Sequence, residues 1–193
     1  MTIHPIEVES YRIMGERVDL SRFPKPSRAV VARVIHASAD LEFADLMVVP
    51  DDAVAAGVEA LRTGAPVVTD VEMVRHGLTG VHAHCYLSEA TSTDGLTRSA
   101  AGMRLAAVRH PEGAVVVIGC APTALFEVVD LAAAGRFRPA LVIGMPVGFV
   151  GAAESKEAAR RSGLPAITNV GEKGGSAVAA ATLNALRRLA DAG

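Results

Sequence analysis

Short apolar runs separated by longer helical segments dominate this sequence of 193 residues. Most runs are rich in Val, Ile, Leu and Ala, and a segment with helical periodicity follows each of them. Strands in such an alternation pair mainly in parallel, because right-handed crossovers place the intervening helices on both faces of one sheet. The runs are Leu46–Val49, Pro66–Thr69, His84–Leu87, Ala114–Ile118, Ala140–Ile143 and Ala166–Val170. We therefore predict an α/β fold, with a mainly parallel sheet of five or six strands and helices on both faces.

Helix boundaries follow from apolar periodicity and from capping residues. The segment Ser27–Ser38 carries an apolar stripe at helical spacing, and Ser27 is expected to be its N-cap. A later helix is expected to begin where Asp51 or Asp52 caps it and to end at Gly64. The remaining helices are expected at Ile3–Val18, Glu72–His76, Arg98–Arg109, Thr123–Ala134, Ala153–Arg161 and Ser176–Leu189. We treat residues 1–193 as a single domain, because the length suits one core and no Ser-, Pro- or Gly-rich linker divides the chain.

The composition favours an aliphatic core and argues against several kinds of partner. Hydrophobic residues make up 50% of the chain, but aromatic residues make up only 4%, which suits strands covered on both faces. A formal net charge of −2 gives no field that would attract nucleic acid or an anionic membrane surface. The longest uncharged runs, Gly113–Phe126 and Pro139–Ala153, are shorter than the roughly 20 apolar residues of a membrane-spanning helix. We expect neither nucleic acid nor a membrane as a partner.

The cysteines and the N-terminal residues favour the cytoplasm. Cys85 and Cys120 lie in apolar, strand-like surroundings without a Cys-x-x-Cys spacing, so a disulfide framework has no support. The first ten residues include acidic side chains where a signal peptide has basic and then apolar ones. A cytoplasmic protein is therefore expected.

The segment Gly144–Lys156 follows an apolar run and precedes a predicted helix. A strand that opens into a Gly-rich turn and then a helix is a common way for α/β proteins to build a ligand site. The glycines let the backbone approach a ligand closely, and the helix start offers unpaired N–H groups to an anion. A tight strand-to-helix turn that binds nothing is the alternative, and the spacing alone does not decide between them.

The motifs of common cofactors and nucleophiles are missing. No Gly-x-Gly-x-x-Gly follows a strand, the segment Gly171–Ser176 does not match a phosphate-binding Walker loop, and no Gly-x-Ser-x-Gly occurs. Only His82, His84 and Cys85 are clustered as metal ligands would be, and alternation along a strand puts the two histidines on one face. Two ligands do not make a metal site, so a solvated or hydrogen-bonded pair of histidines is the alternative. We expect no cofactor and no metal.

Three side chains have settings that suit an anionic ligand or a proton transfer. His36 falls near the end of a predicted helix, where carbonyl groups favour a protonated imidazole. Arg98 begins a helix and Lys156 follows the Gly-rich turn, so each could bind a carboxylate. A packed histidine and two solvated cations are the alternatives that these patterns leave open.

Seven segments together resemble the precorrin-8X methylmutase (precorrin isomerase) family, and the similarity runs nearly from end to end. They are Ile35–Ala37, Gly64–Pro66, Asp70–Val74, Thr97–Ala101, Gly119–Phe126, Gly144–Lys156 and Gly174–Ala177. The resemblance implies an isomerase of cobalamin biosynthesis with an α/β fold. Its substrate would be precorrin-8X or cobalt-precorrin-8, an anionic tetrapyrrole, and a methyl group would move from C11 to C12 to give hydrogenobyrinate or cobyrinate. The resemblance also implies a homodimer with sites at the subunit interface.

The resemblance assigns roles residue by residue. The family's catalytic histidine falls at His36, which inherits the role of proton donor and acceptor. Four further positions match residues that hold the macrocycle, and these are Ser10, Thr79, Arg98 and Lys156. No cofactor is implied.

The chain also departs from the family pattern. Cys120 stands where Asn is usual, and the stretch between Gly80 and Arg98 is shorter than usual. These differences bear on contacts with substrate side chains more than on the reaction, because His36 and Arg98 are in place. A non-catalytic protein that binds or channels corrinoids is the alternative function, and the sequence leaves open whether the macrocycle carries cobalt.

Overall fold

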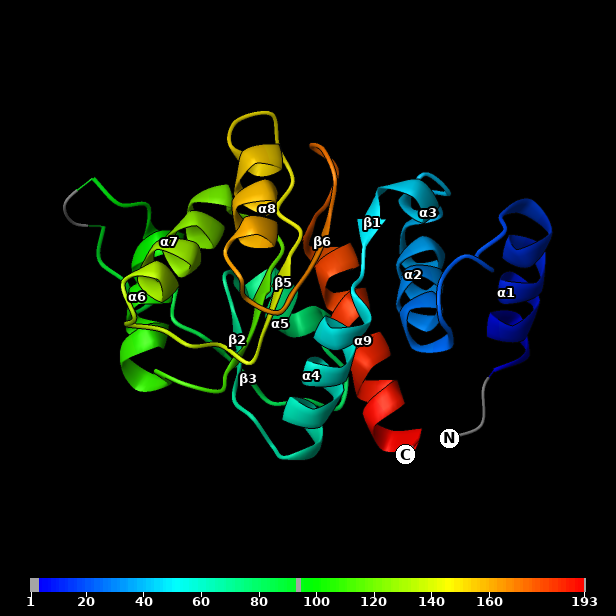
Figure 1. The fold of residues 1–193 in the computed structure, drawn as a ribbon, viewed down its shortest axis with the longest axis horizontal. Coiled ribbons are helices and arrows are strands. Elements are labelled where there is room, and N and C mark those ends of the chain that lie inside the picture. Colours follow the sequence, from blue (N-terminus) through cyan, green and yellow to red (C-terminus); the bar gives the residue numbers. More distant parts are fainter. Residues whose placement is uncertain (1–3, 93–94, 193) are drawn as a thin grey trace.

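One six-stranded sheet forms the centre of the protein (Figure 1). The computed structural model describes residues 4–92 and 95–192. The strands are β1 (Met47–Val48), β2 (Val67–Thr69), β3 (Ala83–Cys85), β4 (Val115–Ile118), β5 (Leu141–Gly144) and β6 (Ala166–Asn169). Their order is β1-β6-β5-β4-β2-β3, and only the β1–β6 pair is antiparallel. The predicted mainly parallel sheet is confirmed.

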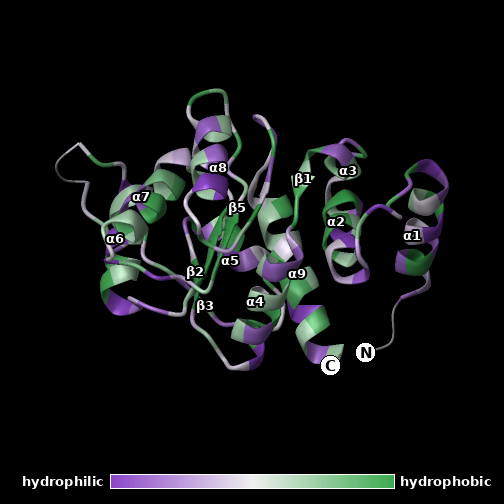
Figure 2. Cartoon of the chain, in the orientation of Figure 1, coloured by the Kyte–Doolittle hydropathy of each residue, from purple (hydrophilic) through white to green (hydrophobic). Residues whose placement is uncertain are grey.

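Helices cover both faces of the sheet, as the sequence predicts. They are α1 (Pro5–Arg17), α2 (Lys25–Ser38), α3 (Phe43–Leu46), α4 (Asp51–Arg62), α5 (Glu72–Gly77), α6 (Arg98–Arg109), α7 (Pro122–Ala133), α8 (Ala152–Arg161) and α9 (Ser176–Ala192). Successive strand residues point to opposite faces, so Val115 and Val117 pack in one apolar cluster with α2, α4 and α9. Val116 and Ile118 pack in a second cluster with α6, α7 and α8. In Figure 2 the strands at the centre are coloured as hydrophobic.

An outer layer of helices extends the fold beyond one edge of the sheet. In Figure 1, α2 lies between α9 and α1, and α1 lies at the end of the molecule opposite α6 and α7. The helix α1 has no fully buried residue, and Met14 and Val18 are only partly buried against the core. The first half of α1 is therefore held to the protein mainly by polar and ring contacts.

Three predicted helix and strand starts are wrong. The helix α2 begins at Lys25, because Pro26 fits the first turn of a helix, and Ser27 instead donates a hydrogen bond to Asp51 Oδ1 at 2.5 Å. Neither Asp51 nor Asp52 caps α4, whose N-cap is Pro50. The predicted strand Leu46–Val49 shrinks to two residues because α3 occupies its start, and Ile3, the predicted start of the first helix, lies outside the described residues.

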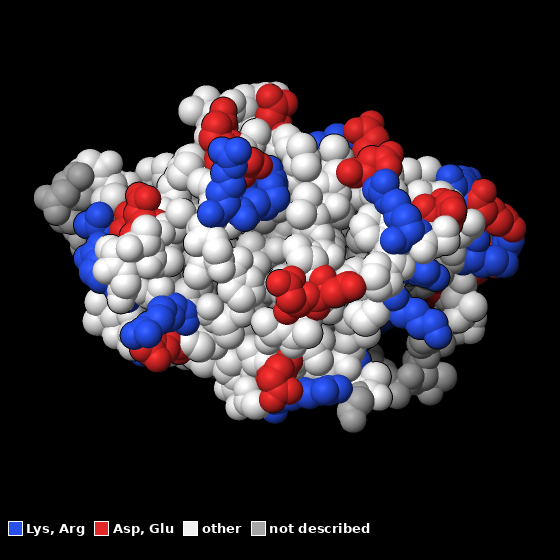
Figure 3. All heavy atoms as spheres, viewed as in Figure 1, with Lys and Arg blue, Asp and Glu red and all other residues white. Residues whose placement is uncertain are grey.

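Charged side chains of both signs are interspersed on the face drawn in Figure 3. Within the described residues, no helix combines the length and the apolar character that crossing a membrane requires.

Candidate active site

The strand order reverses between β2 and β4, and the loops after these two strands meet at that point. Open α/β sheets bind ligands in such a crevice, at the carboxyl ends of the strands. Here the Asp70 carboxylate accepts hydrogen bonds from the backbone N–H groups of Gly119, Cys120 and Ala121, at 3.1, 2.8 and 2.8 Å. Burial raises the pKa of Asp70, and the three N–H groups act in the opposite direction. The Asp70 carboxylate therefore occupies the N-terminal end of α7 and fixes the geometry of the loop between β4 and α7.

The Gly-rich segment singled out in the sequence connects β5 to α8, so the predicted strand–turn–helix arrangement is confirmed. It hydrogen-bonds to the loop after β6: Gly148 N–H donates to the Glu172 carbonyl at 3.1 Å, and Gly175 N–H donates to the Met145 carbonyl at 2.8 Å. Gly174 has a φ of +158°, and a Cβ at this position would clash with the carbonyl oxygen of Met145. The two loops are thus locked together at the carboxyl edge of the sheet.

Lys156 is fully buried, which differs from its expected place as a contact for a substrate carboxylate. Its ammonium donates hydrogen bonds to the Lys173 carbonyl at 2.6 Å and to Asn169 Oδ1 at 3.4 Å. Burial and the charge of Arg160 lower the pKa of Lys156 to about 8, and the charge of Glu172 acts in the opposite direction. The ammonium thus hydrogen-bonds to the last residue of β6 and to the loop that follows this strand.

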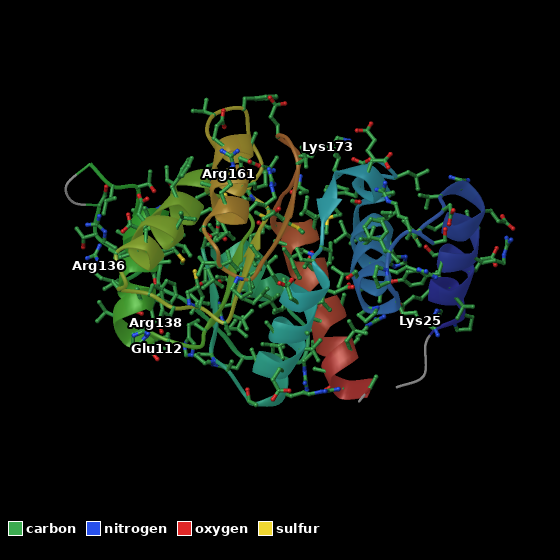
Figure 4. The ribbon with its side chains drawn as sticks, viewed as in Figure 1. Lys25, Glu112, Arg136, Arg138, Arg161 and Lys173 are labelled. Atoms are coloured by element: carbon green, nitrogen blue, oxygen red, sulfur yellow. The ribbon has the colours of Figure 1, made fainter. Side chains whose placement is uncertain are left out.

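Lys173 connects the same loop to the end of α2, and Figure 4 labels it beside α3. Its Nζ lies 2.6 Å from the Asp40 carboxylate and 2.8 Å from the Glu42 carboxylate. The hydrogen bond between Lys173 and Asp40 lowers the pKa of Asp40 and raises the pKa of Lys173. Since Asp40 follows α2 by two residues, this ion pair holds the helix end that carries His36 against the loop.

His36 lies in the last turn of α2, where the sequence places it. Its Nδ1 is hydrogen-bonded to Ser10 Oγ in α1 at 2.9 Å, and the Tyr11 ring stacks on the imidazole with a centroid separation of 4.8 Å and an interplanar angle of 13°. Within residues 4–92 and 95–192, no group hydrogen-bonds to its Nε2. Ser10 can donate to a neutral imidazole or accept from a protonated one. The ring is thus held at one nitrogen and one face, while its second nitrogen is available to a ligand.

Thr79 and Arg98 hydrogen-bond to neither member of the Ser10–His36 pair. Thr79 is exposed after α5, and its N–H donates to Asn184 Oδ1 in α9 at 2.9 Å. Arg98 is exposed at the start of α6 and forms no ion pair with any residue that the structure describes. The helix α6 packs on the opposite face of the sheet from α2, and Figure 1 shows the two helices toward opposite ends of the molecule.

Three histidines gather at the edge strand β3. The His84 ring lies 5.0 Å from that of His82 and 4.9 Å from that of His110, and Tyr86 Oη hydrogen-bonds to His110 Nε2 at 2.7 Å. Burial, together with the charges of His84 and Arg109, lowers the pKa of His110. In the part of the chain that the structure describes, no group of three or more His, Cys, Asp or Glu side chains could hold a metal ion.

A surface hollow of about 480 Å³ adjoins the Ser10–His36 pair through Ser10. It is lined by Pro5, Ile6, Glu9, Ser10 and Ile13, all from α1. A single helix therefore supplies its wall.

The sequence alone did not identify several residues around the imidazole. Tyr11 enters the family resemblance only as the aromatic residue that follows Ser10, and Glu7, Arg33 and Arg188 carried no signal. Glu7 Oε1 accepts hydrogen bonds from Arg33 at 3.2 Å and Arg188 at 2.7 Å, and these partners are brought together only by the packing of α1, α2 and α9.

The fold and the site define a single-sheet α/β protein whose candidate chemistry is proton transfer by one imidazole. The sequence profile of precorrin-8X methylmutase matches residues 5–189. The chain therefore belongs to the precorrin-8X methylmutase family, a family of isomerases that move a methyl group, and the resemblance predicted from the sequence is confirmed.

Relatives named cobalt-precorrin-8 methylmutase and relatives named precorrin-8X methylmutase are both similar to nearly the whole chain. A cobalt-precorrin-8 methylmutase of Priestia megaterium is 40% identical, and the alignment covers 100% of this chain and 92% of that protein. A precorrin-8X methylmutase of Sinorhizobium sp is 41% identical over 93% of this chain and 91% of that protein. The crystal structure of a precorrin-8X methyl mutase from Thermus thermophilus has a TM-score of 0.87 and 37% identity, covering 96% of this chain and 95% of that one.

Proposed function

We propose that this protein isomerises precorrin-8X or cobalt-precorrin-8 by moving a methyl group from C11 to C12, with His36 as the proton donor and acceptor. The observation that carries the proposal is the geometry of His36, whose Nδ1 is held by Ser10 while its Nε2 stays available. Membership of the methylmutase family supplies the reaction and the substrate class.

A methyl shift around a conjugated ring needs no hydride carrier and causes no net change in protons. Protonation of the macrocycle withdraws electron density and so helps the methyl group to migrate. In the protonated imidazole, Nδ1–H would donate to Ser10 Oγ and Nε2–H would donate to the macrocycle. The stacked Tyr11 ring would keep the imidazole plane fixed while the proton leaves and returns. One histidine can therefore serve both steps of a turnover.

The acidic side arms of the macrocycle need cationic and N–H partners. Arg98 is suited to this role because its guanidinium is exposed and a charged guanidinium binds carboxylates in a bidentate way. Ser10 and Thr79 offer hydroxyl groups, and Lys156 acts by positioning the loop after β6. The roles of Ser10, Thr79 and Arg98 follow the family resemblance, the positioning role of Lys156 departs from it, and all four remain predictions.

The proposed active form is a homodimer whose sites lie at the subunit interface. It is supported by the packing of the helices that carry Arg98 and His36 on opposite faces of the sheet, and by the hollow beside Ser10, which residues of α1 alone line. The tip of the β5–α8 loop also exposes apolar side chains, with Phe149 and Val150 exposed by 90% and 89%. Such exposed apolar surface suits a contact with a second copy. The cytoplasmic location expected from the sequence also remains a prediction.

Incubation of the purified protein with precorrin-8X tests the function, because the isomerisation changes the absorption spectrum of the conjugated ring. An enzyme converts many equivalents of substrate, so the complete spectral change is expected at substoichiometric protein. A corrinoid-binding or channelling protein would shift the spectrum only in proportion to its own concentration, and that result would refute the proposed activity.

A further inference from the structure

Asn184 is a buried amide within α9, where its neighbours Leu183 and Ala185 are buried as well. Asn is a weak helix former, because its side chain competes for backbone hydrogen bonds, and burial of an amide is costly unless it finds partners. A leucine of similar size would avoid both costs. The presence of the amide at this position therefore calls for an explanation beyond packing.

Both ends of the amide are bound to one loop, the connection between α5 and β3. Asn184 Nδ2 donates to the Gly77 carbonyl at 2.9 Å, and Asn184 Oδ1 accepts from the Thr79 N–H at 2.9 Å. A carbonyl and an N–H together need one donor and one acceptor, which an amide supplies, whereas an ionised Asp has acceptors only and Leu has neither. The backbone of this loop thus matches Asn and neither of its isosteres.

Close packing of α5 on α9 brings the loop within reach of the amide, and Figure 1 shows α5 beside α9. A Cβ added to Gly77 would lie 2.9 Å from the Cβ of Ala180, so a glycine is needed for the end of α5 to come this near. Ala180 and Asn184 are four residues apart in α9 and therefore share one face of the helix. The glycine sets the distance, and the amide fixes the backbone on both sides of Leu78.

The segment held in this way lies at the surface. Gly77, Thr79 and Gly80 are all exposed, and within residues 4–92 and 95–192 the Thr79 hydroxyl has no hydrogen-bond partner. Water can bind to backbone groups at the surface, so neither hydrogen bond from Asn184 is required to avoid a buried, unpaired polar atom. For stability alone, an apolar side chain at position 184 would serve nearly as well. The effect that remains is a restriction on where the Thr79 hydroxyl can lie.

We infer that Asn184 is a positioning residue, which holds the Thr79 hydroxyl in place for an acidic side arm of the substrate. The inference rests on the proposed function, because the contact between Thr79 and the macrocycle is itself a prediction. A hydroxyl on a loosely held loop loses conformational freedom when it binds a ligand, whereas a loop that is fixed on folding has already lost it. Asn184 therefore raises the affinity through Thr79 and touches no ligand itself.

A double-mutant cycle on hydrogenobyrinate binding tests the inference without any turnover. Thr79→Val removes the hydroxyl and is expected to weaken binding about tenfold, the scale of one hydrogen bond to a charged group. Asn184→Leu removes both hydrogen bonds to the loop and is expected to weaken binding about fivefold. Because Asn184 acts through the hydroxyl, the double variant should bind no more weakly than Thr79→Val alone. In Thr79→Ser, which keeps the hydroxyl, Asn184→Leu should again weaken binding about fivefold.

Leu186→Ala is the matched control for a loss of stability. Leu186 is fully buried on the same helix, but it packs beside Gly57 in α4 and not against the loop. This variant should lower the melting temperature and leave the affinity for hydrogenobyrinate unchanged. Should Asn184→Leu fail to fold, Asn184→Asp enters the same cycle, because it keeps the shape of the side chain and loses the donor to the Gly77 carbonyl.

Unchanged affinity in Asn184→Leu, or a loss that multiplies with that of Thr79→Val, would overturn the inference. An equal loss in Leu186→Ala, or a Thr79→Val variant that binds normally, would overturn it as well. The outcome is separable from the proposed function. A protein that turns over precorrin-8X while the two losses multiply refutes only the positioning role, and a protein that shows the coupled losses but does not isomerise refutes only the activity.

Discussion

Pairing of two impaired variants in one dimer tests whether the active site is shared between subunits. The helices that carry His36 and Arg98 pack on opposite faces of the sheet, so we expect a site that uses both residues to take them from different chains. In a mixed dimer of His36→Ala and Arg98→Ala, one site then receives both mutations and the other receives none. Since a twofold dimer has two equivalent sites, the purified mixed dimer should show about half the activity of the wild type.

A second mixed dimer makes the test reciprocal. When a wild-type chain is paired with a chain carrying both His36→Ala and Arg98→Ala, every shared site lacks one of the two residues. This dimer should be nearly inactive, whereas a site contained in one chain would retain about half the wild-type activity. Dimers are isolated through two different affinity tags on co-expressed chains, and precorrin-8X conversion is followed by absorbance with substrate below KM. An inactive first dimer with a half-active second one, or a monomer in solution at assay concentration, would refute the shared site.

Three further predictions concern single side chains. His36→Ala should lower turnover by at least about a hundredfold, the usual contribution of a general acid or base, while hydrogenobyrinate still binds in a titration; near-normal turnover would exclude the proposed role. Arg98→Ala should weaken hydrogenobyrinate binding by about tenfold or more. Unchanged affinity would show that Arg98 is a solvated surface residue that does not bind the ligand. Lys156 has a folded pKa of about 8, below its ordinary 10.5. Between these pH values the unfolded chain therefore binds more protons at Lys156 than the folded chain does. The free energy of unfolding should rise by up to ~3 kcal/mol as the pH increases across this window, and this gain is lost when the pH falls through 8. In urea unfolding the wild type should show this rise relative to Lys156→Met, and parallel pH profiles would contradict it.

The sheet could be predicted from the sequence because each strand can be recognised from its own residues and their immediate neighbours. Ala114–Ile118 is an apolar run with a helix on either side, and no distant contact is needed to recognise it. The start of α2 was missed for the opposite reason. Ser27 has the side chain of an N-cap, but its partner is Asp51, and only the tertiary fold brings that carboxylate within reach.

The candidate site was predictable in residue type more than in geometry. The place of His36 near a helix end follows from local periodicity, and the structure agrees. The burial of Lys156 could not be predicted, because it depends on Asn169 and on the carbonyl of Lys173, which approach from the next strand and its loop. A charged residue after a Gly-rich turn is expected at the surface unless such internal acceptors are present.

The surroundings of the imidazole are built from contacts that the core does not require. Ser10 and Tyr11 come from α1, Lys173 comes from the loop after β6, and each meets the end of α2 through a hydrogen bond, a ring contact or an ion pair. The apolar face of α2 would pack on α9 without any of them, because its valines already fill that interface. Helix α1 in particular buries too little apolar surface to be explained as part of the core. Its place in the fold is better explained by the side chains that it brings to His36, so the geometry of the site rests on polar contacts between segments and not on the hydrophobic core.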